Sequence, residues 1–124
     1  MTERRLAGLM GFEAATLVVA STLHLAGAVD DGSPPFRPDR AGIAEAVIAV
    51  VLAAGAAALV RGARGVALGA VAFAIAAFGV GLSMTVRGGA AGDIAYHATM
   101  MPLLFFTLML LARRRGELAP PLRS

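Results

Sequence analysis

The sequence predicts an all-α integral membrane protein, an up-down four-helix bundle in which residues 1–124 form a single domain. Four long apolar runs fill most of the chain, and each reaches the roughly 17 residues that span a bilayer core of about 30 Å. Hydrophobic residues make up 58% of the chain and charged residues only 15%, against roughly 25% charged in an average soluble domain. The runs are unbroken rather than alternating, which favours helices over a transmembrane β-barrel.

The first span is predicted over about residues 6–29 and the second over about residues 41–60. The first run is too long and too polar in its middle for a removable signal peptide, so we expect a permanent helix. The second run is mostly Ala, Val and Gly. Small residues let helix backbones approach closely, which supplies van der Waals packing where lipid offers no hydrophobic drive.

The third span is predicted over about residues 66–86 and the fourth over about residues 94–112. Gly65 and Gly69 form a pair with helix–helix spacing, which we assign to packing inside the bundle in preference to dimerisation. Pro102 in the fourth span lacks an N–H and clashes with the carbonyl one turn earlier, so we expect a kink there.

Three short connections, residues 30–40, 61–65 and 87–93, make consecutive spans antiparallel neighbours. The first connection, DDGSPPFRPDR, contains three prolines, which deny it a helix and make it a stiff cap.

Arginine supplies all eleven basic residues and indicates the orientation of the chain. One end of the predicted bundle carries Arg4, Arg5, Arg61, Arg64, Arg113, Arg114, Arg115 and Arg123. By the positive-inside rule both termini are then cytoplasmic, and the chain is a multi-pass protein of the plasma membrane. The net charge of +3 lies at the membrane edges, so it does not indicate a nucleic-acid partner.

Ionisable residues gather at the opposite, outer end of the four spans. His24, Glu45, Asp93 and His97 all lie there, with Tyr96 beside them. A charge or imidazole in hydrocarbon costs free energy, so several at one depth indicate a shared site. We expect His24, Glu45 and His97 to exchange protons or hydrogen-bond a ligand, Asp93 to orient His97, and Tyr96 to line the pocket.

Two residues of this end have simpler roles open to them. Asp93 is placed to cap the N-terminus of the fourth helix, where an acidic side chain meets unpaired N–H groups. Arg87 closes the third span and is placed to anchor the membrane edge, or to support the site.

Glu13 is separate, because at roughly 1.5 Å per residue it lies some 16 Å below His24. Such a deep carboxylate needs a proton or a partner on another helix.

Three kinds of chemistry fit the outer residues. His24, Glu45 and His97 are candidate ligands for iron, manganese or zinc, although the E-x-x-H spacing of carboxylate-bridged di-iron bundles is absent. His24 and His97 at similar depth are also a candidate pair for haem, but the neighbouring carboxylates argue against it. Proton exchange through Glu13 or Glu45 requires no cofactor. The chain has no cysteine, which excludes disulfides and cysteine-ligated iron–sulfur clusters.

The stretch from Gly42 to Arg64 resembles the DoxX-type small four-helix membrane proteins. Glu45 opens an Ala/Gly/Leu-rich helix there, followed by Gly and Arg before a third helix. The resemblance covers most of the chain by architecture and implies a lipid-phase or quinone-like partner. Glu13 and His24 depart from it, since neither has a counterpart in that family's first helix.

The chain is also similar to the small multidrug resistance transporters, in its size and in the glutamate of its first span, Glu13. That resemblance implies that Glu13 binds a cation or a proton. The absence of Trp departs from it, because a cation-binding cage needs aromatic side chains.

We therefore predict a small plasma-membrane protein that holds an apolar or quinone-like ligand between its helices, as a binding protein or a redox-associated subunit. A proton-coupled transporter working through Glu13, as a homodimer, is the first alternative. A structural partner subunit without a ligand is the second. The sequence leaves open whether the protein is an enzyme.

Overall fold

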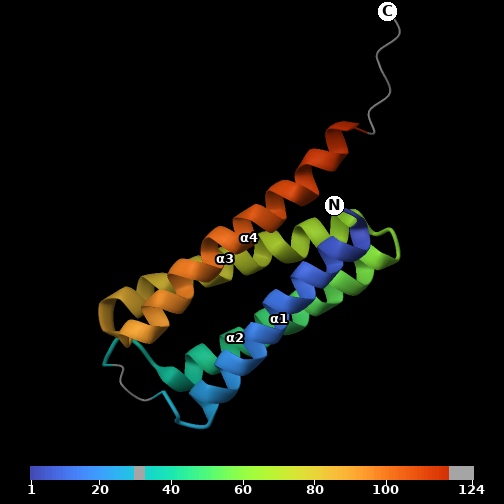
Figure 1. Cartoon of the computed structure of the whole chain (residues 1–124). Helices are drawn as coiled ribbons and strands as arrows, with labels where there is room; N and C mark the ends of the chain where they lie inside the picture. Colours follow the sequence, from blue (N-terminus) through green and yellow to red (C-terminus); the bar gives the residue numbers. More distant parts are fainter. Residues whose placement is uncertain (30–32, 118–124) are drawn as a thin grey trace, which may run out of the picture.

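The computed structural model describes residues 1–29 and 33–117, and four α-helices account for nearly all of them (Figure 1). The helices are α1 (Glu3–Leu25), α2 (Pro38–Val60), α3 (Arg64–Gly88) and α4 (Ala91–Glu117). Each contains a stretch long and apolar enough to cross a membrane. The predicted all-helical architecture of four membrane-length helices is confirmed.

The helix ends differ from the predicted spans by a few residues, for local reasons. The hydroxyl oxygen of Thr2 accepts a hydrogen bond from the Arg5 N–H and caps α1, which begins three residues early. The helix ends at Leu25, shortly before Gly27 adopts a φ of 69°, a left-handed conformation that glycine allows. Pro38 is the first residue of α2, where its missing N–H costs no helical hydrogen bond. The last of the three loop prolines therefore starts a helix instead of preventing one.

The helices pack in chain order as antiparallel neighbours. Helix α1 packs on α2, α2 on α3 and α3 on α4, and α1 also touches α4, less extensively than any two consecutive helices touch (Figure 1). We call the end with the α1–α2 and α3–α4 connections the distal end, and the end with the N-terminus and the α2–α3 connection the proximal end. Pro102 lies within α4 without interrupting it.

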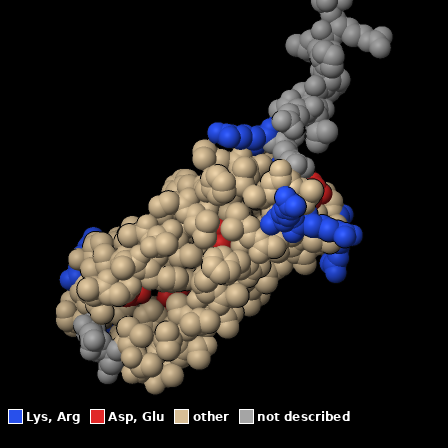
Figure 2. Space-filling model, in the orientation of Figure 1, with Lys and Arg blue, Asp and Glu red and all other residues tan. Residues whose placement is uncertain are grey.

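Large apolar side chains fill the space between the helices. Those that are almost fully buried include Leu6, Met10, Leu17, Leu52, Leu59, Phe78, Leu104 and Leu111. Many other valine, leucine and phenylalanine side chains are exposed. The face in Figure 2 has arginines toward its two ends and a largely uncharged surface between them. This distribution suits helices that contact lipid on their outer faces.

Glycines let α2 approach its neighbours. A Cβ placed on Gly55 would lie 2.5 Å from the Cβ of Ala70, so α2 and α3 meet closely there. A Cβ on Gly69 would have no neighbour within 4 Å. The expectation that Gly69 serves internal packing is therefore wrong, and Gly55 of α2 has that role instead.

Arg64 joins three helices at the proximal end. Its guanidinium donates hydrogen bonds to the carbonyl oxygens of Leu110 and Leu111 in α4, at 2.6–3.2 Å, and pairs with Glu3 of α1 at 3.2 Å. Arg64 was predicted only to mark the cytoplasmic edge. Its contacts also connect α3 to α1 and α4.

Candidate functional site

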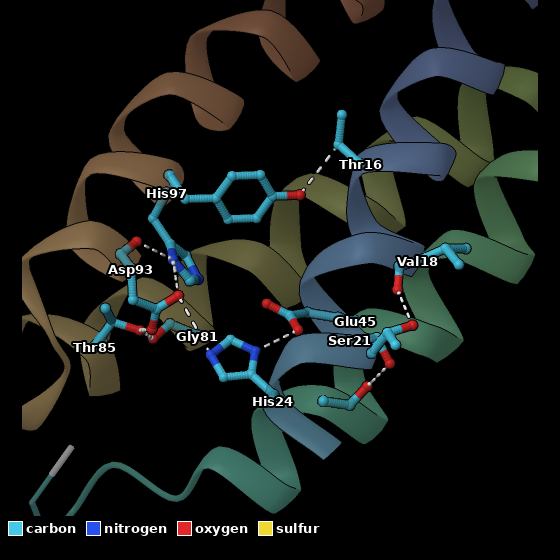
Figure 3. A network of polar contacts seen from close by, with 12 residues as sticks. Thr16, Val18, Ser21, His24, Glu45, Gly81, Thr85, Asp93 and His97 are labelled. Carbon is cyan, nitrogen blue, oxygen red and sulfur yellow. Dashed lines mark hydrogen bonds and ion pairs between the residues drawn. The ribbon is translucent and has the colours of Figure 1, made fainter. Parts of the chain in front are cut away.

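Four buried ionisable side chains from three helices meet at the distal end of the bundle (Figure 3). They are His24 of α1, Glu45 of α2, and Asp93 and His97 of α4. We call these four residues the distal cluster. Burying several such groups together is costly unless each is paired or binds something, so the contacts of each one decide what the cluster can do.

The imidazole of His24 lies between two carboxylates. Its Nδ1 is 2.7 Å from Oε2 of Glu45, a short hydrogen bond, and its Nε2 is 3.7 Å from Oδ1 of Asp93. The second distance is too long for a hydrogen bond. The ring is thus held from one side and unpartnered on the other.

Asp93 is held by contacts on both sides. The Thr85 hydroxyl of α3 donates to its Oδ2 at 3.3 Å, and Nδ1 of His97 lies 2.9 Å from its backbone carbonyl oxygen and 3.6 Å from Oδ1. We expected Asp93 to cap α4, but that helix begins two residues earlier, at Ala91. The carboxylate keeps a place in the first turn and points into the cluster instead, toward Thr85 and His24 (Figure 3).

His97 is fixed by its neighbours. A carbonyl oxygen can only accept, so Nδ1 of His97 carries the proton and Nε2 is left for other contacts. The ring stacks on Phe78 of α3, with centroids 4.3 Å apart and an angle of 22° between planes. A Cβ on Gly81 would lie 3.3 Å from Nε2, so glycine at that position gives the ring its space.

Phe78 and Gly81 were not among the predicted site residues. They lie three residues apart on α3, and Thr85 follows after four more, which is the spacing of one helical face. That periodicity was available in the sequence, but only the packing of α3 against α4 shows that the face meets His97.

Three buried side-chain atoms lack a hydrogen-bond partner within the described part of the chain: Glu13 Oε2, His24 Nε2 and Glu45 Oε1. Two of them belong to the distal cluster. A buried polar atom without a partner costs roughly 1–3 kcal/mol, more if charged, so such atoms indicate a missing ligand, ion or water.

Two openings reach the cluster from opposite sides. The α1–α4 groove, of about 550 Å³, is lined by Thr16, Val19, Ala20, Leu23, His24, Val29, Ala90, Gly92, Asp93 and Tyr96. The α2–α3 pocket, of about 260 Å³, has mainly apolar walls; its polar lining residues are Arg37, Arg40, Glu45, Thr85 and His97. Figure 2 shows acidic atoms recessed in the otherwise uncharged middle of the visible face. The distal cluster thus separates the two openings.

Tyr96 lies beside the cluster, in the wall of the α1–α4 groove. Its hydroxyl is 3.1 Å from the hydroxyl of Thr16, which also donates to the backbone carbonyl of Glu13 at 2.8 Å. Thr16 has one proton, so in this arrangement it accepts the proton of Tyr96.

Glu13 shares no hydrogen bond with the distal cluster. Its side chain is fully buried, and its Oε1 accepts a 2.6 Å hydrogen bond from the Thr107 hydroxyl of α4. The expected partner on another helix is therefore present. Arg87, expected to support the site, has an exposed side chain, and no hydrogen bond or ion pair joins it to any described residue.

One set of metal-ligand side chains comes together in the described residues: His24, Glu45 and Asp93 offer ligand atoms within 4.8 Å of one another. The sequence suggested His24 and Glu45 with His97. The structure brings Asp93 to that place, while His97 uses Nδ1 on a backbone carbonyl and stacks on Phe78.

Comparison with protein-family models, with curated proteins and with solved structures finds no match for this chain. The resemblances to the DoxX-type proteins and to the small multidrug resistance transporters therefore stay predictions.

Proposed function

We propose that this chain is a multi-pass plasma-membrane protein that binds a small apolar or quinone-like molecule in the α1–α4 groove, against the distal cluster. Both termini would be cytoplasmic, which places the cluster in the outer half of the membrane. The observation that carries the proposal is the meeting of a largely apolar groove with buried polar atoms of His24 and Asp93.

The side of the bundle on which the groove opens suits a ligand that arrives from the lipid. The groove lies between α1 and α4, which touch less extensively than consecutive helices do, and exposed apolar side chains such as Val18 and Val19 lie along α1 beside it. Its small lining residues, including Ala20 and Gly92, leave room for a flat ring. Ligand sites commonly combine such apolar walls with a few convergent polar groups.

His24 supplies the polar chemistry that such a ligand requires. When Nδ1 donates its proton to Glu45, Nε2 has a free lone pair and accepts a hydrogen bond from a quinol hydroxyl. When the ring carries both protons, Nε2 donates to a quinone carbonyl and Glu45 balances the charge. Tyr96 offers a second hydroxyl within the same groove.

Tyr96 also provides the assay, because it is the only tyrosine and the chain has no tryptophan. Decylubiquinone titrated into the purified protein in detergent should quench the tyrosine emission saturably, at one molecule per chain. A Gly92→Leu variant should lose the saturable part, since position 92 lines the groove and has free space around it. Gly79→Leu, on a helical position with equally open space, is the control. Equal, non-saturating quenching in all three proteins would reduce the interaction to partition into detergent and contradict the proposal.

A second candidate function, proton-coupled transport through Glu13, is favoured by one observation. Glu13 is fully buried, yet Oε2 has no hydrogen-bond partner among the residues that the structure describes. Adding tetraphenylphosphonium to the protein in unbuffered detergent should then release protons, and Glu13→Gln should abolish the release. No release from the unaltered protein would remove this candidate. If the decylubiquinone titration fails too, a structural subunit is left, and a stoichiometric partner in purification would support it.

A further inference from the structure

We propose that the distal cluster binds one divalent first-row transition-metal ion, Mn²⁺, Fe²⁺ or Zn²⁺, through His24, Glu45 and Asp93. The ligand atoms of these three residues lie within 4.8 Å of one another, and they come from three different helices. The proposal does not rest on the quinone-like ligand, and an ion bound to His24 Nε2 would exclude a direct hydrogen bond from that atom to such a ligand.

Unpartnered atoms point to a ligand at this place, independently of the clustering. His24 Nε2 and Glu45 Oε1 are buried and have no hydrogen-bond partner among the described residues. His24 Nε2 faces Oδ1 of Asp93 at 3.7 Å. This is too far for a hydrogen bond but close to the roughly 3.4 Å between two ligands that each lie about 2.1 Å from a tetrahedral ion.

The contacts around the cluster hold Asp93 in place and leave Glu45 free to move. Asp93 is fixed, because Thr85 holds Oδ2 and His97 contacts its backbone carbonyl, so Oδ1 is left toward His24. Such outer contacts are typical of metal ligands. Glu45 lies on the other side of the His24 ring and is the one that must move. It has the freedom to do so, because its side chain has three torsions and its Oε1 is unbound.

A divalent cation suits the charge of the three ligands. With both carboxylates ionised and the imidazole neutral they would carry −2, and an uncompensated charge buried in a low dielectric is costly. One divalent ion makes the set neutral. One nitrogen and two oxygen ligands suit Mn²⁺, Fe²⁺ and Zn²⁺, whereas Mg²⁺ prefers six oxygens and retains its water. The α1–α4 groove and the α2–α3 pocket give water or a further ligand access to the remaining positions.

The test is a titration of Mn²⁺ into purified, chelator-stripped protein, followed by the loss of the six-line paramagnetic resonance signal of free Mn²⁺. We expect one ion per chain, displaced by Zn²⁺ but not by an equal concentration of Mg²⁺. His24→Gln and Asp93→Asn should weaken binding by at least about 100-fold, since even outer-contact variants lose 10–100-fold. Glu3→Gln removes a carboxylate at the proximal end, outside the cluster, and should bind as the unaltered protein does.

A second measurement keeps the proposal testable if a cluster variant fails to fold. Zn²⁺ should raise the Tm of the unaltered protein and of Glu3→Gln, because an ion that binds only the folded state stabilises it. Mg²⁺ should not. Absence of Mn²⁺ binding and of a Zn²⁺-dependent Tm shift in the unaltered protein would overturn the proposal, as would equal Mn²⁺ affinity in folded Asp93→Asn.

Discussion

At the scale of single residues, the distal cluster shows how one position decides what its neighbour can do. Asp93 and His97 are one helical turn apart on α4, but Asp93 reaches across to His24 while His97 turns to the ring of Phe78. The backbone carbonyl of Asp93 fixes the proton of His97 on Nδ1. Asp93 is thus a candidate metal ligand, and His97 helps to position it.

Gly81 is predicted to protect the position of His97. In Gly81→Val the new side chain would collide with Nε2, which lies 3.3 Å from a Cβ at this position. We expect a loss of about 1–3 kcal/mol in unfolding free energy from overpacking, together with a change in the NMR signals of the His97 ring. Gly79→Val, where a Cβ meets nothing within 4 Å, should leave these signals unchanged. If the unfolding free energy and the His97 signals changed equally in both variants, the effect would come from helix propensity alone.

Glu13 and Thr107 are predicted to be coupled energetically. Thr107→Val removes the hydroxyl that donates to Oε1, so neither carboxylate oxygen would have a partner, at a cost of about 1–3 kcal/mol or more. Glu13→Met combined with Thr107→Val should recover most of that loss, because replacing both partners with apolar groups is nearly neutral. Reversible unfolding in detergent measures the cycle. Additive losses would show that the hydrogen bond contributes nothing to stability.

At the scale of helices, the closeness of each pair is set by the smallest side chains between them. Helix α2 approaches α3 at Gly55, and its Gly42 lies against Leu25 and His24 of α1. Helices α1 and α4 touch less extensively than the consecutive helices do, and the groove opens between them. The same architecture therefore produces a tight α2 interface and an accessible site.

The α2–α3 interface is predicted to tolerate no side chain at position 55. In Gly55→Leu the added atoms would overlap Ala70, since even a Cβ would lie 2.5 Å from its Cβ. We expect unfolding free energy to fall by about 1–3 kcal/mol or more through overpacking. Gly69→Leu has open space and should cost far less, as judged from thermal unfolding in one detergent. If Gly69→Leu instead lowers the oligomeric state, that face is a dimer interface.

At the scale of the whole molecule, the arginines decide the direction in which the chain is predicted to insert. Figure 2 shows them at the two ends of the face, and the larger group lies at the end that carries the N-terminus. Since the helices alternate in direction, this orientation also places the α1–α2 connection and the distal cluster outside.

The orientation can be measured by cysteine labelling, because the chain has no cysteine of its own. An exposed Ser33→Cys in the α1–α2 connection should react with an impermeant maleimide in intact cells. An exposed Thr2→Cys, next to the start of α1, should react only after the cells are permeabilised. The reverse pattern would place the distal cluster on the cytoplasmic side.

The sequence by itself determined the number of membrane-length helices, their approximate limits and the position of each ionisable residue along them. These follow from local quantities, the length of an apolar run and the rise per residue of a helix, so His24, Glu45 and His97 were predicted to share one end. The rise per residue also separated Glu13 from these residues. In the structure Glu13 has its own hydrogen-bond partner, Thr107.

Only the tertiary structure decided which side chains meet. The rotation of each helix about its axis and the distance to its neighbour depend on packing among all four helices, which no single span encodes. That rotation brings Asp93 rather than His97 beside His24 and Glu45, and leaves Arg87 at the surface. It also opens the groove between α1 and α4, which touch less extensively than any two consecutive helices.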